Sequence, residues 1–305
     1  MRYGVCYKGS KNQIAEWIVD NLPSADTFVD LFCGGGAITH RALLSGKYKH
    51  FIMNDIDARL PKLFIDCANG KYTTDNHKEW ISRDDFFRLN DTDAYIALVW
   101  SFGNNGKDYI YGKDIEQFKK ALHYAVMFDD VSLLNQYILV NKSELKTIDE
   151  RYKYYQLVLQ NKKHNLIENV SRLISCERLQ SLQSLQSYGL SYEQVTIPHG
   201  ALIYCDIPYC STNCGKYSGF NHSKFYEWAS EQENIFISEY EMPDEFIEFA
   251  NIEKTVLSSA IGNNSKAIEK IFTNKKTYDK LSNEMKERQI INTSKQMNLF
   301  DFGIY

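Results

Sequence analysis

The 305-residue sequence lacks the features that place a chain in a membrane or direct it out of the cell. It has no secretory signal peptide and no apolar run long enough to span a bilayer. It also lacks an excess of basic residues, because 35 Lys and Arg residues stand against 39 Asp and Glu residues, for a net charge of −4. A globally basic nucleic-acid binder is therefore not indicated, although the basic surface that contacts DNA need only be local. We expect a cytoplasmic protein whose length suffices for one large α/β domain and an inserted module.

A standard metal site is also missing. The seven cysteines are scattered along the chain, and several lie in predicted buried strands. Without a signal peptide, we interpret them as reduced thiols. A zinc site is conceivable, but the spacing of its candidate ligands matches no standard zinc pattern: Cys205, Cys210, Cys214 and His222. The sequence therefore predicts no metal.

A glycine-rich turn lies near the N-terminus, between a predicted strand and a predicted helix. Residues 27–32 form an apolar, β-branched and aromatic run typical of a buried parallel strand, and residues 37–44 show helical spacing. The three glycines between them, Gly34 to Gly36, allow a sharp turn and a close approach of the backbone to a ligand. This is the context of a nucleotide-binding turn, although the dinucleotide fingerprint G-x-G-x-x-G is absent.

A second apolar run, residues 50–55, ends in Asp55, about twenty residues after the first strand. A carboxylate at this place can accept hydrogen bonds from both hydroxyls of a ribose. Taken alone, the segment also fits an ordinary βαβ unit with an acidic strand end.

Far downstream, residues 201–205 form another predicted strand, with Asp206 at its carboxyl end, where open α/β sheets bind ligands. The amino group of a nucleobase is a poor nucleophile because its lone pair is delocalised into the ring. Two acceptors, the Asp206 carboxylate and the Ile207 carbonyl, would favour a pyramidal nitrogen, and Tyr209 can stack on the base. The two motifs together indicate an enzyme that moves a methyl group from S-adenosylmethionine to a planar amino group.

With these motifs, the chain resembles the Dam-like, D12-class adenine-specific DNA methyltransferases, in which an F-x-G-x-G loop binds S-adenosylmethionine and a D-P-P-Y motif holds the flipped adenine. Residues 7–11 are similar to the family's N-terminal cofactor motif, and residues 190–195 to its segment before the catalytic strand. Residues 236–240 and 267–272 look like its later strands. The resemblance implies an α/β fold with a Rossmann-like methyltransferase sheet and an inserted, mainly helical DNA-recognition domain. It implies cofactor contacts from Tyr7, Lys11, Asp30, Phe32, Gly34, Gly36, Asp55, Ile56, Tyr192 and Asp206, and a catalytic tetrapeptide of Asp206, Ile207, Pro208 and Tyr209.

The tetrapeptide departs from the family pattern at one position, where Ile207 replaces a proline. The second position contributes its carbonyl, which isoleucine keeps, and Pro208 biases Ile207 toward an extended backbone. The change nevertheless leaves open a module that binds cofactor and DNA without catalysis.

The resemblance also predicts the domain organisation. Residues 1–69 and 171–275 would form the catalytic domain, residues 70–170 the DNA-recognition insert and residues 276–305 a C-terminal tail. Helical spacing at 115–122 and 152–157 supports a helical insert. Candidate contacts to base edges or phosphates are Lys8, Asn104, Asn105, Lys107 and Lys113, although a solvated turn explains any single one equally well.

Two short segments carry separate predictions. A three-residue repeat, Leu-Gln-Ser, at 179–187 is interpreted as a structural helix without chemistry. The peptide Gln296, Met297, Asn298, Leu299 and Phe300 looks like the motif with which bacterial and phage DNA-processing proteins bind the sliding clamp. A tail that docks on its own domain is the alternative.

The sequence thus predicts a site-specific DNA adenine N6-methyltransferase that acts on a flipped adenine in double-stranded DNA. A methyltransferase for RNA or for a protein glutamine could share the fold, but that group more often starts its tetrapeptide with asparagine and lacks the motif at residues 7–11. An unrelated nucleotide-binding α/β protein would not explain both motifs.

Overall fold

The computed structural model describes residues 3–72, 78–159, 184–209, 219–257, 264–283 and 285–286. The chain divides into two compact units. The first consists of residues 1–13, 34–40 and 57–183, and the second of residues 14–33, 41–56 and 184–305.

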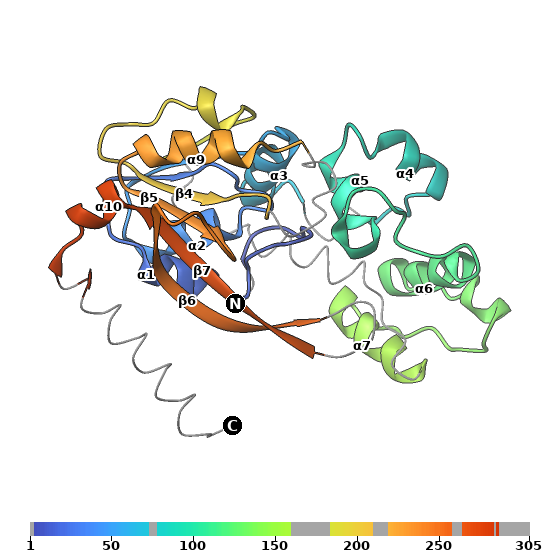
Figure 1. The fold of residues 1–305 in the computed structure, drawn as a ribbon. Coiled ribbons are helices and arrows are strands. Elements are labelled where there is room, and N and C mark those ends of the chain that lie inside the picture. Colours follow the sequence, from blue (N-terminus) through green and yellow to red (C-terminus); the bar gives the residue numbers. More distant parts are fainter. Residues whose placement is uncertain are drawn as a thin grey trace, which may run out of the picture. The chain divides into compact units, whose positions relative to one another are not determined.

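A seven-stranded sheet forms the centre of the second unit (Figure 1). Its strands lie in the order β3-β2-β1-β4-β5-β7-β6. The first five in this order are parallel, and β7 runs antiparallel to both β5 and β6. The strands are β1 (Thr27–Asp30), β2 (His50–Asn54), β3 (Leu185–Tyr188), β4 (Leu202–Asp206), β5 (Ile235–Glu239), β6 (Phe246–Leu257) and β7 (Asn264–Asn274).

The strand order reverses at β1. From β1 the chain continues to β2 and β3 on one side, and then returns to place β4 against the other side of β1. In the register, Val29 of β1 lies opposite both Ile52 of β2 and Ile203 of β4. Such a reversal is a topological switch point, where open α/β sheets bind ligands beyond the carboxyl ends of the strands.

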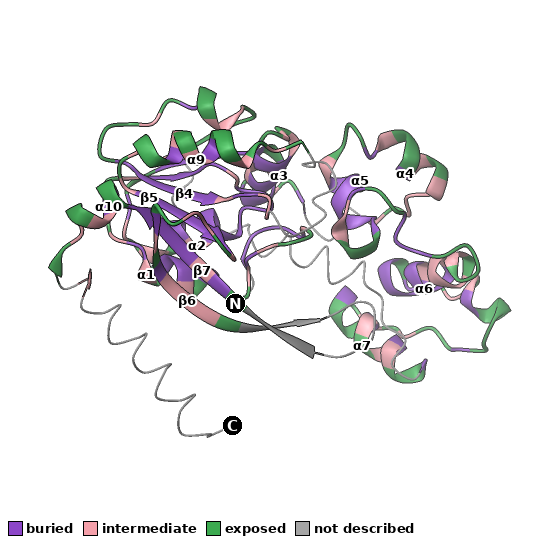
Figure 2. Cartoon of the chain, in the orientation of Figure 1, coloured by how far each residue is buried: buried purple, intermediate pink, exposed green. Residues whose placement is uncertain are grey.

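The apolar core of this unit forms because alternate residues of the parallel strands point to the same face of the sheet. On one face, Phe225 and Ala229 of α9 (His222–Glu231) pack on side chains from four strands, and all are fully or almost fully buried (Figure 2): Val29, Leu31, Ile52, Ile203, Cys205, Ile235 and Ile237. Helix α1 (Ala15–Asn21) buries Ala15, Ile18 and Val19. The Lys47 ammonium donates to three backbone carbonyls at the end of α1, which complements its negative end: those of Val19, Asp20 and Leu22.

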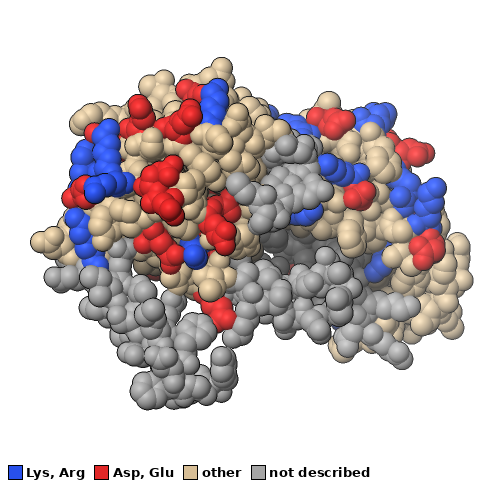
Figure 3. Space-filling view, in the orientation of Figure 1, with Lys and Arg blue, Asp and Glu red and all other residues tan. Residues whose placement is uncertain are grey.

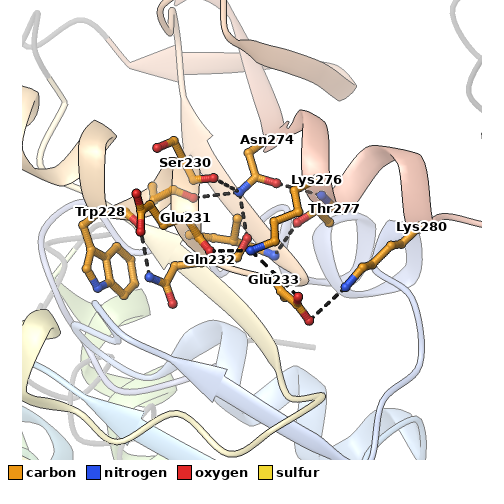
Figure 4. Close-up of polar contacts among 11 residues, drawn as sticks. Trp228, Ser230, Glu231, Gln232, Glu233, Asn274, Lys276, Thr277 and Lys280 are labelled. Carbon is orange, nitrogen blue, oxygen red and sulfur yellow. Dashed lines mark hydrogen bonds and ion pairs between the residues drawn. The ribbon is translucent and has the colours of Figure 1, made fainter.

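Asn274 connects α10 (Lys275–Lys280) to the end of α9 in the second unit (Figure 4). Its Nδ2 donates to the carbonyls of Ala229 and Gln232 at 2.7 and 2.9 Å, at the end of α9, while its Oδ1 accepts from Thr277 N at 2.7 Å, at the start of α10. The Thr277 hydroxyl in turn accepts from Ile235 N of β5. The segment predicted as a tail therefore begins with a helix that is part of the second unit. Residues 287–305, with the predicted clamp peptide at Gln296, Met297, Leu299 and Phe300, lie outside the described residues.

The first unit is mainly helical where it is described. Its helices are α3 (Arg59–Ala68), α4 (Arg83–Leu89), α5 (Ala94–Val99), α6 (Glu116–Phe128) and α7 (Ile148–Val158), with short 3-10 turns η1 (Phe102–Asn104) and η2 (Leu134–Gln136). Helix α2 (Ala37–Ser45) begins in the first unit and ends in the second. Three helix starts are capped by side chains that accept from the backbone N–H three residues on: Ser82, Asp93 and Thr147.

Helices α6 and α7 share a small core of their own. Leu122, Ala125 and Val126 of α6 pack against Tyr155 of α7. The buried Arg151 donates to the carbonyls of Val126 and Met127, which are left over at the end of α6.

The predicted elements at 27–32, 37–44, 50–55, 201–205, 236–240 and 267–272 are confirmed, as are the helices at 115–122 and 152–157. The helix predicted for the repeat is wrong at Leu185 to Ser187, which belong to β3 and pair with β2. Strand pairing supplies backbone hydrogen bonds that a periodicity of three does not reveal. The rest of the repeat, residues 179–183, lies outside the described residues. No described helix has the length and apolar character that crossing a membrane requires.

Candidate active site

Three acidic side chains gather at the switch point of the second unit. Asp30 ends β1, Asp55 follows β2 directly and Asp206 ends β4. Asp30 and Asp55 are buried, at 1% and 5% exposure, while Asp206 is half-buried. Because β1, β2 and β4 are adjacent and parallel, their carboxyl ends lie at one edge of the sheet, and the three predicted acids share that edge.

A buried amide, Asn54, holds the backbone around this edge. Its Nδ2 donates to the carbonyls of Leu31 and Leu190, both at 3.0 Å, and its Oδ1 accepts from Leu190 N at 3.0 Å. Its own backbone carbonyl accepts from Cys33 N at 2.9 Å. Asn54 therefore connects the segments that follow β1, β2 and β3. Asn54 was not among the predicted site residues, because a polar residue at the end of an apolar strand gives no sign of a partner 136 positions away.

An aromatic group lies beside the same segments. Phe32 and Tyr192 have ring centroids 5.6 Å apart, and both pack against Phe225 of α9. Phe220 and Trp228 complete the group. Burial raises the pKa of Tyr192 to about 12, with a smaller contribution from Glu193, so its hydroxyl stays protonated at neutral pH. Flat, uncharged rings of this kind suit a flat ligand such as a nucleobase. The predicted contact Ile56, directly after Asp55, is exposed.

Packing within the first unit explains why the turn has glycine at positions 34 and 36. A Cβ added at Gly34 would lie 2.8 Å from the Tyr7 ring, and one at Gly36 would lie 2.7 Å from the Phe64 ring. Both residues also have positive φ, 48° and 70°. Tyr7, a predicted cofactor contact, thus packs directly on the turn. Lys11, from the same N-terminal segment, is buried at 8% exposure.

The tetrapeptide 206–209 is held on several sides. The Ile207 side chain is buried in the apolar core of the sheet. Nε2 of His222, at the start of α9, lies 2.6 Å from the Pro208 carbonyl and must be the donor, because a carbonyl can only accept. The Tyr209 hydroxyl donates to the buried Glu269 of β7. Glu269 and His222 were not predicted to hold the tetrapeptide.

The buried thiols near the site are inert. Burial raises the pKa of Cys33 well above its usual value, and the carboxylates of Asp55 and Asp30 raise it further. Burial acts likewise on Cys205. Protonated thiols are neither nucleophiles nor metal ligands. In the part of the chain that the structure describes, no group of three or more His, Cys, Asp or Glu side chains is arranged to hold a metal ion; Cys210 and Cys214 lie outside it.

The predicted DNA-contact residues lie in the first unit. Asn104 Nδ2 donates to the Leu98 carbonyl, and Asn105 Oδ1 accepts from the backbone N–H groups of Lys107 and Asp108. Both amides therefore shape the turn in which they lie. The side chains of Lys8, Lys107 and Lys113 are exposed. On the face drawn in Figure 3, basic side chains are interspersed with acidic ones, in agreement with the small net charge.

The sheet and the helix that covers it define a mixed α/β protein, in which carboxylates and aromatic rings lie at the carboxyl ends of β1, β2 and β4, the edge at which open α/β sheets bind ligands. The chain belongs to the D12 class N6 adenine-specific DNA methyltransferase family, whose family model matches residues 7–279. The seven-stranded, mostly parallel sheet is consistent with a methyltransferase fold. None of the curated proteins gives a match to the chain.

Proposed function

We propose that the protein transfers a methyl group from S-adenosylmethionine to N6 of a flipped adenine at a specific site in double-stranded DNA. The observation that carries this proposal is the position of Asp206 and Tyr209. Asp206 ends β4 and Tyr209 follows that strand, which pairs with β1, in a chain that belongs to an adenine methyltransferase family.

The carboxylate and the aromatic rings at the switch point suit the cofactor. Asp55 is a buried carboxylate directly after β2, where it can accept from both ribose hydroxyls. Phe32 and Tyr192 offer ring faces and edges for the adenine of the cofactor, and Asp30 supports the turn between β1 and α2. Tyr7, Lys11, Gly34, Gly36 and Ile56 are proposed as further contacts on the strength of the family resemblance. When bound, S-adenosylmethionine supplies a methyl group activated by its sulfonium.

The target amino group requires acceptors and a fixed base plane. Asp206 and the carbonyl of Ile207 would accept hydrogen bonds from its two hydrogens, so that the nitrogen lone pair is free to attack the methyl carbon. The methylated nitrogen would then lose one of these hydrogens as a proton toward Asp206. Pro208 keeps the backbone extended between them and Tyr209, which would stack on the base. The adenine must leave the helix, because its amino group is otherwise paired, and this extrusion costs a few kcal/mol.

The DNA would be contacted by the helical segment within residues 70–170. Lys107 and Lys113, together with Lys8, are proposed to contact phosphates. Asn104 and Asn105 are proposed to shape the turn and to present its backbone, because their side chains already bind neighbouring groups.

The test is expression in a bacterial host without adenine methylation, followed by sequencing of the host DNA with modification-sensitive reads. The parent should leave N6-methyladenine at one recognition sequence. Asp206→Ala should reduce the rate on the corresponding oligonucleotide by about a hundred-fold or more, because a preorganised acceptor is lost. Asp26→Ala, at an exposed acid that pairs with Lys49, is the matched control and should retain the parent rate.

Three outcomes would contradict the proposal. If Asp206→Ala turns over at nearly the parent rate, Asp206 is not the acceptor for the target amino group. Cofactor and DNA binding without any methylated adenine would identify a non-catalytic module, as the Ile207 departure allows. Methyl transfer to RNA or to a protein glutamine instead of DNA would identify the other substrate class.

A further inference from the structure

Glu269 is a fully buried carboxylate next to the tetrapeptide 206–209. It lies on β7, is 0% exposed and accepts a hydrogen bond from the hydroxyl of Tyr209, which is 60 positions away in the sequence. Acidic side chains are almost never fully buried unless they are paired, because burial without a partner costs several kcal/mol. Because water does not solvate the Glu269 side chain, its hydrogen bond to Tyr209 is part of what makes this burial tolerable.

Two parts of the second unit, β7 and the residue after β5, contact the Tyr209 side chain. The antiparallel pairing of β5 with β7 ends at Glu239, which lies opposite Lys270, the neighbour of Glu269, and Tyr240 follows directly after β5. The Tyr240 ring packs against the Tyr209 ring at a centroid distance of 4.7 Å and an angle of 75°. Tyr209 is therefore fixed at its hydroxyl by β7 and at its ring by the end of β5.

The direction of the hydrogen bond follows from the charges around it. Burial raises the pKa of Tyr209 well above its usual value, and the nearby carboxylates of Asp206 and Glu269 raise it further. The phenol therefore keeps its proton at neutral pH and donates it to the hydrogen bond. Bonds from a hydroxyl to a carboxylate are among the stronger ones in proteins.

We propose that Glu269 is a positioning residue for the methyl transfer, and that it acts by holding the Tyr209 ring in the plane against which the flipped adenine stacks. This inference rests on the proposed function. A tyrosine whose hydroxyl is fixed loses the freedom of both side-chain torsions, so the base meets a preorganised surface instead of having to order it.

The same hydrogen bond has an electronic consequence. A phenol that donates to a carboxylate has a more electron-rich ring than a phenol in water. The face of such a ring attracts positive charge more strongly. Since the amino nitrogen gains positive charge as it takes up the methyl group, Glu269 would lower the barrier through Tyr209 without touching the substrate.

The test is a double-mutant cycle with Tyr209→Phe, Glu269→Gln and the double variant, measured as single-turnover methylation of DNA with saturating cofactor. Each single change should lower the rate by about ten-fold, the value of one hydrogen bond of about 1.4 kcal/mol. The double variant should be no slower than Tyr209→Phe, because both changes remove one interaction. The affinity for S-adenosylmethionine should stay within about two-fold.

Glu248→Gln is the matched control. Glu248 lies on the partner strand β6 and pairs with Lys270, the neighbour of Glu269, in an ion pair of 2.9 Å that is partly exposed. Its replacement should leave the parent rate unchanged. If Tyr209→Phe retains the parent rate, or if the double variant loses about a hundred-fold, then Glu269 does not act through the Tyr209 hydroxyl and the proposal is overturned.

A measurement without turnover separates this proposal from the proposed function. With 3-fluorotyrosine at position 209, the 19F resonance should shift in Glu269→Gln and stay in place in Glu248→Gln. If the resonance shifts only in Glu269→Gln but the protein methylates no DNA, the proposed function is wrong. The hydrogen bond between Glu269 and Tyr209 is then established, but it has no catalytic role. An unchanged resonance in a folded Glu269→Gln variant overturns the positioning role whether or not the parent is active.

Discussion

Asn54 and Leu190 exchange two hydrogen bonds of 3.0 Å each, with the amide side chain donating through Nδ2 and accepting through Oδ1. The exchange joins the end of β2 to the segment that leads from β3 to Tyr192. Because the same Nδ2 also binds the Leu31 carbonyl, one side chain sets the spacing of three segments that border the proposed cofactor site.

Asn54→Ala should therefore lower stability and cofactor affinity together. Removing the amide leaves the buried Leu31 carbonyl and the partly exposed backbone groups of Leu190 without this partner, at a cost of about 1–3 kcal/mol in the free energy of unfolding. Urea denaturation measures the first effect and calorimetry with S-adenosylmethionine the second. Asn21→Ala, which removes a single bond to the Trp17 carbonyl, is the control and should cost about 1 kcal/mol without changing cofactor binding. If Asn54→Ala and Asn21→Ala lose the same stability and neither changes cofactor affinity, Asn54 does not organise the cofactor site.

Asp55→Ala should weaken S-adenosylmethionine binding by about 1.5–3 kcal/mol, the value of a hydrogen bond to a charged group. The side chain is buried after β2, so its replacement by alanine leaves no substitute acceptor at that place. Calorimetry with the cofactor is the measurement, and Asp26→Ala is the control. Unchanged affinity would show that the carboxylate does not contact the ribose.

Ile207 should matter through its side chain for stability and through its carbonyl for catalysis. Ile207→Val removes one methyl group from a core that includes Val195 and Phe225, so it should cost about 1 kcal/mol of stability while the rate stays within two-fold. Ile207→Pro loses more of this packing but keeps the carbonyl in an extended backbone, and methylation should stay within about ten-fold of the parent. An inactive parent that proline activates would instead indicate that the natural chain has lost catalysis.

His40 should make the protein less stable in mild acid. Burial lowers its pKa to about 4, and its Nδ1 accepts from Gly4 N at 3.0 Å, which requires the neutral ring. Between pH 6.5 and 4 the unfolded chain binds the proton more readily than the folded one. Stability is therefore complete above pH 6.5 and falls through this window by roughly 2–3 kcal/mol for this group.

His40→Asn keeps an acceptor near the position of Nδ1 but does not titrate. Thermal unfolding between pH 7 and 4.5 should thus show a smaller pH dependence than in the parent. The slope should not vanish, because the pKa of the buried His123 is also lowered to about 4. An unchanged slope would mean that the pKa of His40 does not differ between the folded and the unfolded protein.

The sequence was sufficient to predict the strands that carry the site. β1, β2 and β4 are apolar runs that end in Asp30, Asn54 and Asp206, and the carboxyl ends of parallel strands share one edge of a sheet. Helices α6 and α7 were visible in their 3.6-residue spacing. These features are local, so a short window of sequence contains them.

The supporting contacts could not be predicted, because each depends on a partner far along the chain. Glu269 reads as one charge in a polar strand until β7 brings it to Tyr209. The glycines of the turn suggested only a ligand, yet the structure also packs Tyr7 against Gly34. The segment of β3 was misread because its pairing with β2, and not its own periodicity, decides its conformation.

The switch point also dictates when the site can form during synthesis. Val29 and Ile203 are neighbours in the sheet but lie about 170 residues apart in the sequence. At a ribosomal rate of 5–20 residues per second, β4 leaves the ribosome roughly 10–35 s after β1. Throughout that interval, one edge of β1 has no native partner, and an unpaired strand edge is a template for wrong pairing. The nascent chain thus needs protection for this edge, from its own early helices or from a chaperone, until the strand that carries Asp206 arrives.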